Sequence, residues 1–185
     1  MKPLHLLALP ALGLALVAAG AAGQSRSKPE KPKPSASLSL LGKPMPRLDV
    51  SPWKNGDIEL PKAANGKVTI VCFFSAESKD CESMIARHNE IVDRLGPKGL
   101  LLLSVATSES SAEAVAALAQ EKGARFPIAR DAKGKTAKTW GVESVPTYAV
   151  ADGMTRLRAI EMTLDQSLEL AENLLKEIQP KGSKH

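Results

Sequence analysis

Apolar and polar positions follow one another along the chain in blocks that predict strands and helices in turn. Residues 68–74 and 100–106 are apolar at nearly every position, which is typical of strands that are buried on both faces of a sheet. Between them, residues 79–95 place apolar side chains at helical spacing, and Gly96-Pro97 follows, so we expect a helix that ends there. This order predicts a layered α/β domain.

The second half of the chain continues the pattern with shorter elements. Ser110-x-x-Glu113 predicts a capping box at the start of an Ala-rich helix, and Thr163-x-x-Gln166 predicts another before a last helix. The other elements that we expect are a hairpin at Asn55-Gly56, an extended piece at 126–129, helical turns at 133–140, and strands at 146–151 and 157–162.

The first 23 residues have the layout of a secretory signal peptide. Lys2 gives a positive start, residues 4–17 form an apolar run, and residues 18–23 are all Ala and Gly. We expect cleavage after Gly23 and therefore a periplasmic or secreted protein. The alternative is an uncleaved anchor, because residues 4–22 carry no formal charge and are just long enough to cross a bilayer.

Residues 24–47 differ from the rest in composition. They combine repeated prolines with six basic residues and one acidic residue, Glu30, which predicts a solvated, semi-extended tether that could touch an anionic membrane surface weakly. The whole chain has a net charge of +5, but this excess lies in the signal and the tether. The expected domain, residues 48–180, has no basic excess, so we expect no nucleic-acid partner. Residues 181–185 are expected to form a disordered tail.

Two motifs carry more specific information. In Val145-Pro146-Thr147 a proline stands at the start of a predicted strand. This is unusual because proline has no N–H to donate to the hydrogen bonds between strands. Ser78-x-x-Cys81 begins the helix that follows the first predicted strand. In their order and spacing these motifs resemble the thioredoxin fold, and in particular the periplasmic TlpA/ResA-like thiol–disulfide oxidoreductases.

The resemblance covers residues 41–178 and implies a thioredoxin-like three-layer α/β/α fold with a central mixed β-sheet. It also implies a cis peptide bond before Pro146 and a groove at Val145, Pro146 and Thr147 that holds a client peptide. The partner that it implies is an envelope protein or peptide, including one that contains a thiol.

The chain departs from that family at the reactive motif. The family carries Cys-x-x-Cys, in which the first thiol attacks as a thiolate and the second resolves the mixed disulfide. Here Ser78 stands at the attacking position and only Cys81, at the resolving position, is a thiol. Two-thiol exchange within this motif is therefore excluded. For Ser78 we favour the role of a helix N-cap whose oxygen accepts a backbone N–H.

Besides a structural or assembly factor that the basic tether holds near the membrane, three functions stay open at this point. The first is an altered single-thiol redox role through Cys81, and the second is a redox-inactive module that binds a client peptide around Pro146. The third is a peroxiredoxin-like peroxidase that uses Cys81, because Ser-x-x-Cys is similar to the Thr/Ser-x-x-Cys of peroxiredoxins. That family has a proline where this chain has Phe74 and an arginine where it has the Val-Pro-Thr segment, which weakens the third reading.

Cys72 is the second thiol of the chain. The resemblance places it where thioredoxins have a buried acid beneath the resolving cysteine, so a Cys72–Cys81 disulfide is a hypothesis, with two separate core cysteines as the favoured alternative. His88 lies on the apolar stripe of the same helix, and we expect a core histidine there. The His, Cys and carboxylate residues do not have metal-ligand spacing, so we expect no metal and no cofactor.

Overall fold

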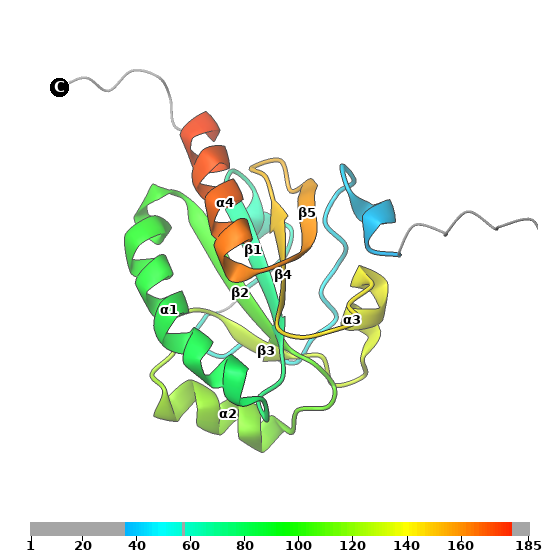
Figure 1. Ribbon diagram of the computed structural model, residues 1–185, viewed down its shortest axis with the longest axis vertical. Helices are drawn as coiled ribbons and strands as arrows, with labels where there is room; N and C mark the ends of the chain where they lie inside the picture. Colours follow the sequence, from blue (N-terminus) through cyan, green and yellow to red (C-terminus); the bar gives the residue numbers. More distant parts are fainter. Residues whose placement is uncertain (1–35, 57, 179–185) are drawn as a thin grey trace, which may run out of the picture. The chain divides into compact units, whose positions relative to one another are not determined.

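The computed structural model describes residues 36–56 and 58–178, apart from the side chains of residues 80–82. A five-stranded sheet in the order β3-β2-β1-β4-β5 forms the centre of the fold (Figure 1). The strands are β1 Val68–Phe74, β2 Leu100–Ala106, β3 Ile128–Arg130, β4 Thr147–Ala151 and β5 Leu157–Met162. The β1–β2 and β2–β3 pairs are parallel, whereas the β1–β4 and β4–β5 pairs are antiparallel. This is the mixed sheet of the predicted thioredoxin-like fold.

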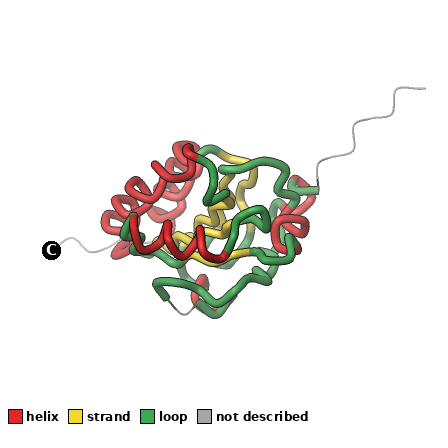
Figure 2. The backbone as a smooth tube through the Cα atoms, turned by 90° about the horizontal axis from the view of Figure 1, so that it is seen from below, coloured by secondary structure: helices red, strands yellow, loops and turns green. Residues whose placement is uncertain are grey.

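Helices lie on both sides of the strands (Figure 2). The helices are α1 Lys79–Leu95, α2 Ala112–Glu121, α3 Lys135–Trp140 and α4 Leu164–Ile178, with 3₁₀ turns at Leu38–Leu40, Lys62–Ala64 and Gly96–Lys98. Side chains of α1, α2 and α4 pack on one face of the sheet. The other face is covered by Trp140 of α3 and by partly buried residues of the segment 40–53. No helix in the described part of the chain is long and apolar enough to span a membrane.

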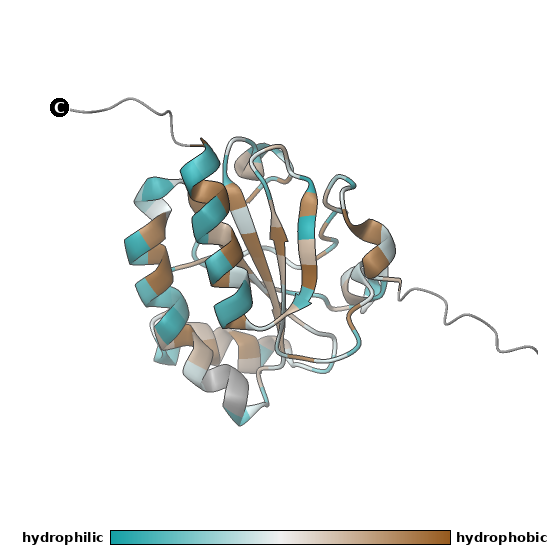
Figure 3. Cartoon of the chain, turned by 45° about the horizontal axis from the view of Figure 1, so that its top comes forward, coloured by the Kyte–Doolittle hydropathy of each residue, from teal (hydrophilic) through white to brown (hydrophobic). Residues whose placement is uncertain are grey.

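The burial of β1 and α1 follows from their sequence patterns. All residues of β1 are buried, because the sheet is covered on both faces. On α1 the buried side chains recur every three or four residues, so the helix turns one apolar stripe to the sheet and its polar side chains to solvent (Figure 3). Removing each large aliphatic side chain of this stripe from water contributes about 1.5–3 kcal/mol.

The start of α2 differs from the prediction by one residue. Ser111 is the N-cap, and its Oγ accepts the N–H of Ala114 at 3.0 Å. The predicted cap, Ser110, is buried, and its hydroxyl oxygen accepts the N–H of Ala76 at 2.9 Å. The prediction was wrong because consecutive serines both suit a cap by type, and only the tertiary contact with Ala76 separates them.

The capping box predicted for α4 is present. The N–H of Thr163 donates to Gln166 Oε1 at 3.0 Å, and the N–H of Gln166 donates to Thr163 Oγ1 at 3.3 Å. The helix then runs beside α1, to which an Arg94–Glu172 ion pair of 2.6 Å connects it. Both charged groups of this pair are partly exposed, so its contribution to stability is small.

The predicted hairpin at Asn55-Gly56 is absent from the described residues. Lys54 instead forms an isolated antiparallel bridge with Ile128 of the edge strand β3. The Asn55 side-chain amide donates to the carbonyl oxygen of Ala124 at 2.8 Å. The unpaired groups of an edge strand are a ready partner for a passing segment, and this partner lies far away in the sequence.

The prediction of a solvated tether as far as residue 47 is also wrong for its last part. Gly42 N–H donates to the Leu157 carbonyl and Met45 N–H to the Thr155 carbonyl, both at 2.7 Å. Ser37 is fully buried. The folded domain therefore begins at least as early as Ser37. The predicted signal peptide, the earlier part of the tether and the tail lie outside the described residues.

Candidate functional site

Three loops come together at one edge of the sheet: residues 75–78 after β1, 107–111 after β2, and 142–146 before β4. Strands β1 and β2 are parallel, so their C-terminal ends lie at the same edge. Strand β4 is antiparallel to β1, and Phe73 pairs with Thr147, so β4 begins where β1 ends. The topology thus places the Ser78 motif and the Pro146 motif next to each other, although 68 positions separate them in the sequence.

The loop 75–78 is fixed mainly by its main chain. Ser78 N–H donates to the Ser75 carbonyl at 3.2 Å, which closes a turn. Ala76 N–H donates to the Ser110 hydroxyl at 2.9 Å and so ties this loop to the one after β2. Ser110, which the sequence pattern had predicted to be a helix cap, therefore connects the loop after β1 to the loop after β2.

The carboxylate of Glu77 belongs to the residue directly before the Ser78-x-x-Cys81 motif. Burial raises its pKa, but hydrogen bonds from the Ser111 N–H and from the Ser75 and Ser110 hydroxyls lower it, and the net pKa is below the usual value for glutamate. Ser111 N–H donates to Glu77 at 3.2 Å and Ser75 Oγ at 3.1 Å. Glu77 is therefore ionised at neutral pH and adds a negative charge beside Ser78.

Ser78 is the N-cap residue of α1, as predicted, with φ −81° and ψ 127°. Its side chain makes no capping hydrogen bond within the described part of the chain, so that detail of the prediction was wrong. The bond from Ser78 N–H to the Ser75 carbonyl already sets the cap conformation through the main chain. Cys81 lies in the first turn of α1, and its side chain is outside the described part of the structure.

Cys72 lies in the core beneath α1. It is fully buried, and its Sγ lies 3.6 Å from Met84 Sδ. Met84 follows Cys81 by three residues, so the two occupy neighbouring turns of one helix face. This arrangement puts Cys72 under the N-terminal half of α1, and its pairing with Cys81 stays a prediction.

His88 is a core residue, as expected, and its ring is hydrogen-bonded. Its Nε2 lies 3.1 Å from the Tyr148 hydroxyl and its Nδ1 lies 3.4 Å from Ser104 Oγ. Burial, with a smaller contribution from the Arg87 cation, lowers the pKa of His88 to about 4. The imidazole is therefore neutral at physiological pH and bonds Tyr148 from inside the core.

The peptide bond between Val145 and Pro146 is cis, as the resemblance implied. Pro146 is exposed, Val145 is half-buried and Thr147 is buried as the first residue of β4. Val145 packs against the buried cluster that contains Trp140, whose ring centroid lies 5.4 Å from that of Phe73. The loop is therefore supported from below by the core, while its proline stays at the surface.

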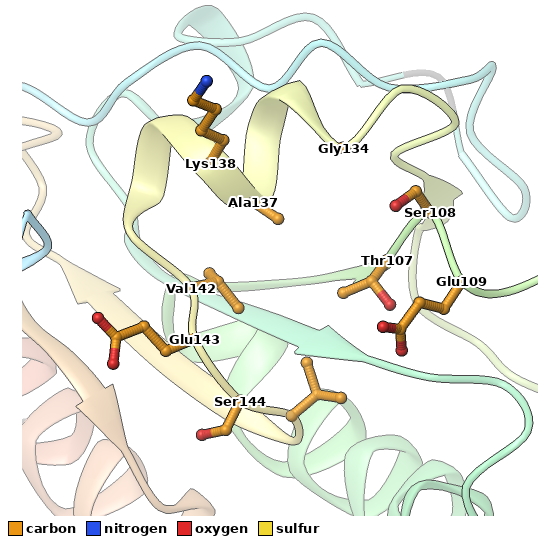
Figure 4. Close-up of a pocket in the computed structure, with 10 residues that line it drawn as sticks. Thr107, Ser108, Glu109, Gly134, Ala137, Lys138, Val142, Glu143 and Ser144 are labelled. Atoms are coloured by element: carbon orange, nitrogen blue, oxygen red, sulfur yellow. The ribbon is translucent and has the colours of Figure 1, made fainter.

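Two pockets flank this loop. One, of about 390 Å³, lies between the loop after β2, helix α3 and residues 142–145 (Figure 4). The other, of about 330 Å³, is lined by Pro146, Thr147 and Glu161 together with neighbours. Val145 lines the first pocket, whereas Pro146 and Thr147 line the second, and a client groove at these three residues stays a prediction. The sequence analysis did not predict that the loop 107–109 and Glu161 line these pockets. Their position at the ends of predicted strands was the only feature of the sequence that could have indicated it.

Across the residues that the structure describes, no group of three or more His, Cys, Asp or Glu side chains could hold a metal ion.

Comparisons with known proteins agree with this geometry. A family model described as the AhpC/TSA family matches residues 41–160. The thiol-disulfide oxidoreductase ResA of Bacillus thuringiensis subsp. konkukian is 29% identical over 140 residues, which cover 76% of this chain and 79% of that protein. The fold is similar to that of a thiol-disulfide isomerase from Corynebacterium glutamicum, with a TM-score of 0.62, 22% identity, and coverage of 71% of this chain and 96% of that one. It is also similar to the thioredoxin domain of a thiol-disulfide oxidoreductase from Bacteroides vulgatus, with a TM-score of 0.63, 16% identity, and coverage of 73% and 97%.

Proposed function

This chain belongs to the AhpC/TSA family and is a TlpA/ResA-like protein of the thioredoxin superfamily, and from that premise we propose that it binds a client peptide beside Pro146 and exchanges disulfides with it through Cys81 alone. The observation that carries the proposal is Ser78 at the N-cap of α1, where a two-thiol enzyme needs its attacking cysteine. The groove at Val145, Pro146 and Thr147 supports the part that concerns the client.

The proposed reaction is a single thiol–disulfide exchange. The Cys81 thiolate attacks one sulfur of a client disulfide and forms a mixed disulfide, while the other client sulfur leaves as a thiolate. Because the Ser78 hydroxyl cannot act as a second thiol, an external thiolate must attack the Cys81 sulfur or the client sulfur to release the client. The helix N-terminus favours the Cys81 thiolate, whereas the ionised Glu77 opposes it.

A second candidate function is a module that binds the client without redox chemistry. It is favoured by the same loss of the attacking thiol, combined with a groove that remains open on both sides of Pro146. The peroxidase alternative would have Cys81 reduce a peroxide, but the buried Phe74 stands where peroxiredoxins have a proline. We therefore rank it below the other two.

Three forms of the chain distinguish these functions: the wild type, Cys81→Ala and Ser78→Cys. We expect the wild type to form a mixed disulfide with a disulfide-containing peptide, and Cys81→Ala to form none. Ser78→Cys should gain catalytic disulfide reduction in the presence of dithiothreitol, because it restores the dithiol motif. If the wild type and Cys81→Ala react equally slowly with disulfide and with hydrogen peroxide, the redox functions fail and the binding module remains.

We propose a periplasmic or secreted location, with the chain released from its signal peptide after Gly23. The apolar start of the chain supports this, and the basic tether could make a weak contact with the membrane surface. The intact mass of the protein recovered from the envelope fraction tests the proposal. A mass that begins at Gln24 supports it, whereas a mass that includes residue 1 supports the membrane anchor.

A further inference from the structure

The two pockets beside the Pro146 loop share one wall. Glu143 and Ser144 line both of them, so the loop is a ridge with a hollow on each side. A peptide that lies along this ridge in an extended conformation projects successive side chains to opposite sides. The residues next to a client cysteine would therefore enter these hollows.

The ionisable side chains of the hollows are mainly acidic. Glu109 and Glu143 line the first hollow and Glu161 lines the second. Lys138 is the basic residue among the lining residues of the first hollow, and Figure 4 shows its amine and the Glu143 carboxylate both pointing away from the other side chains there. The ionised Glu77 on the neighbouring loop adds to the negative charge.

The first hollow also offers apolar surface and an unsatisfied hydroxyl. Ala137, Val142 and Val145 line it, and the side chains of Ala137 and Val142 point into the space between α3 and the loop after β2 (Figure 4). Thr107 lines the same hollow, and its hydroxyl is shielded from solvent without a hydrogen-bond partner among the described residues. Buried polar groups are normally paired, so a ligand donor or acceptor at this position would complete the site.

Apolar walls under acidic rims match one kind of side chain, a long aliphatic stem that ends in a cation. We propose that the groove selects client peptides that carry Lys or Arg next to the cysteine that reacts with Cys81. This inference rests on the proposed function, because it names the class of client that the groove binds. It gives Glu109, Glu143 and Glu161 the role of choosing the client and leaves the exchange chemistry to Cys81.

Peptides of equal length test this without any reaction. Each is acetylated, carries a fluorophore and has Ser at the centre in place of Cys, flanked by Lys, by Gln or by Glu. Binding to the wild-type full chain is measured by fluorescence anisotropy. We expect the Lys peptide to bind about tenfold more tightly than the Glu peptide, and added NaCl to reduce this difference. Equal binding of the three peptides, or tighter binding of the Glu peptide, would overturn the inference.

Charge-removing variants locate the effect. Glu143→Gln and Glu161→Gln should each weaken binding of the Lys peptide by roughly two- to fivefold and weaken binding of the Gln peptide less. Lys138→Gln should not weaken binding of the Lys peptide. The matched control is Glu121→Gln, which removes the same charge at the far end of α2 and should have no effect. If Glu121→Gln weakens binding of the Lys peptide as much as Glu143→Gln does, the net charge of the protein explains the preference and the inference fails.

The same peptides with a central cysteine, activated as a mixed disulfide with thionitrobenzoate, separate this inference from the proposed function. Release of thionitrobenzoate reports the attack by Cys81. Release without a charge preference would support the proposed exchange and overturn the inference. A charge preference in binding without any release would overturn the exchange and support the inference for a binding module.

Discussion

The main chain of Ser37 packs directly against Gly141: a Cβ atom at Gly141 would lie 2.6 Å from the Ser37 nitrogen and 3.0 Å from its Cα. Gly141 follows α3 with a φ of +67° and immediately precedes the loop that carries Val145 and Pro146. The Ser37 hydroxyl also donates to the carboxylate of Glu161, which lines one of the two pockets. The N-terminal segment is thus attached to the fold beside the groove.

Replacing Gly141 by alanine should destabilise the domain through this contact. Gly123→Ala is the matched control, because Gly123 has a φ of +60° and open space around its Cβ position. Both variants suffer the left-handed backbone cost, so the difference between them measures the clash with Ser37, which we expect to be about 1–3 kcal/mol. Urea denaturation of both variants gives this difference, and equal midpoints would contradict the close contact.

His88 should make the stability of the domain depend on pH in one window. Its pKa is about 4 in the folded state against about 6.5 in the unfolded chain, so the unfolded state binds the proton first. Stability is unaffected above pH 6.5, falls as the pH falls from 6.5 to 4, and loses up to about 3 kcal/mol from this group.

The variant His88→Gln keeps a polar partner for Tyr148 but does not titrate. Its free energy of unfolding should change less between pH 6.5 and 4 than that of the wild type. The slopes are compared, rather than the absolute stabilities, because the substitution also removes the packing of the ring on Phe126. Identical slopes would show that His88 is not the group responsible.

Removing either of the two adjacent serines before α2 should destabilise the domain, but for different reasons. Ser111→Ala removes the N-cap of α2 and should cost about 1 kcal/mol. Ser110→Ala leaves the Ala76 N–H without its acceptor and should cost about 1–3 kcal/mol. Amide hydrogen exchange distinguishes them, since only Ser110→Ala should speed exchange at Ala76. Faster exchange at Ala76 in Ser111→Ala instead would contradict the assignment.

A Cys72–Cys81 disulfide is the alternative to the reduced Cys81 that the proposed exchange requires, and this hypothesis predicts a simple result. The protein purified from an oxidising compartment should take up no alkylating reagent under denaturing conditions until it is reduced, and then two alkyl groups per chain. Intact mass spectrometry measures this, with Cys72→Ala as the control in which a single thiol reacts before reduction. Two alkyl groups on the unreduced wild-type chain would contradict the hypothesis.

Local sequence patterns predicted most of the regular elements because their physical causes are local. The apolar run at Val68–Phe74 is typical of a strand covered on both faces, and the stripe of α1 is typical of one buried side of a helix. The capping box at Thr163 uses groups three residues apart, so it was also correct. The family resemblance, not the pattern, supplied the sheet topology and the cis bond before Pro146.

The predictions that were wrong depended on contacts between residues that are distant in the sequence. Ala76 decides which of the two serines before α2 becomes the N-cap, because its N–H donates to Ser110. The Ala124 carbonyl accepts a hydrogen bond from Asn55, and Ser37 packs against Gly141. The pockets are formed by three loops that meet only when the sheet assembles.

For the function, the sequence by itself determined which chemistry is absent: because Ser78, and not a second cysteine, stands three positions before Cys81, the Ser78-x-x-Cys81 motif cannot cycle between dithiol and disulfide. Chemical identity is a property of single residues, so no structure is needed for that conclusion. Only the tertiary structure decided what surrounds the motif, because charge and shape at a site come from residues that folding brings together. It placed Glu109 and Glu143 in one pocket and Glu143 and Glu161 in the other, on the two sides of the loop that leads to Pro146, and that arrangement gives both pockets acidic lining residues.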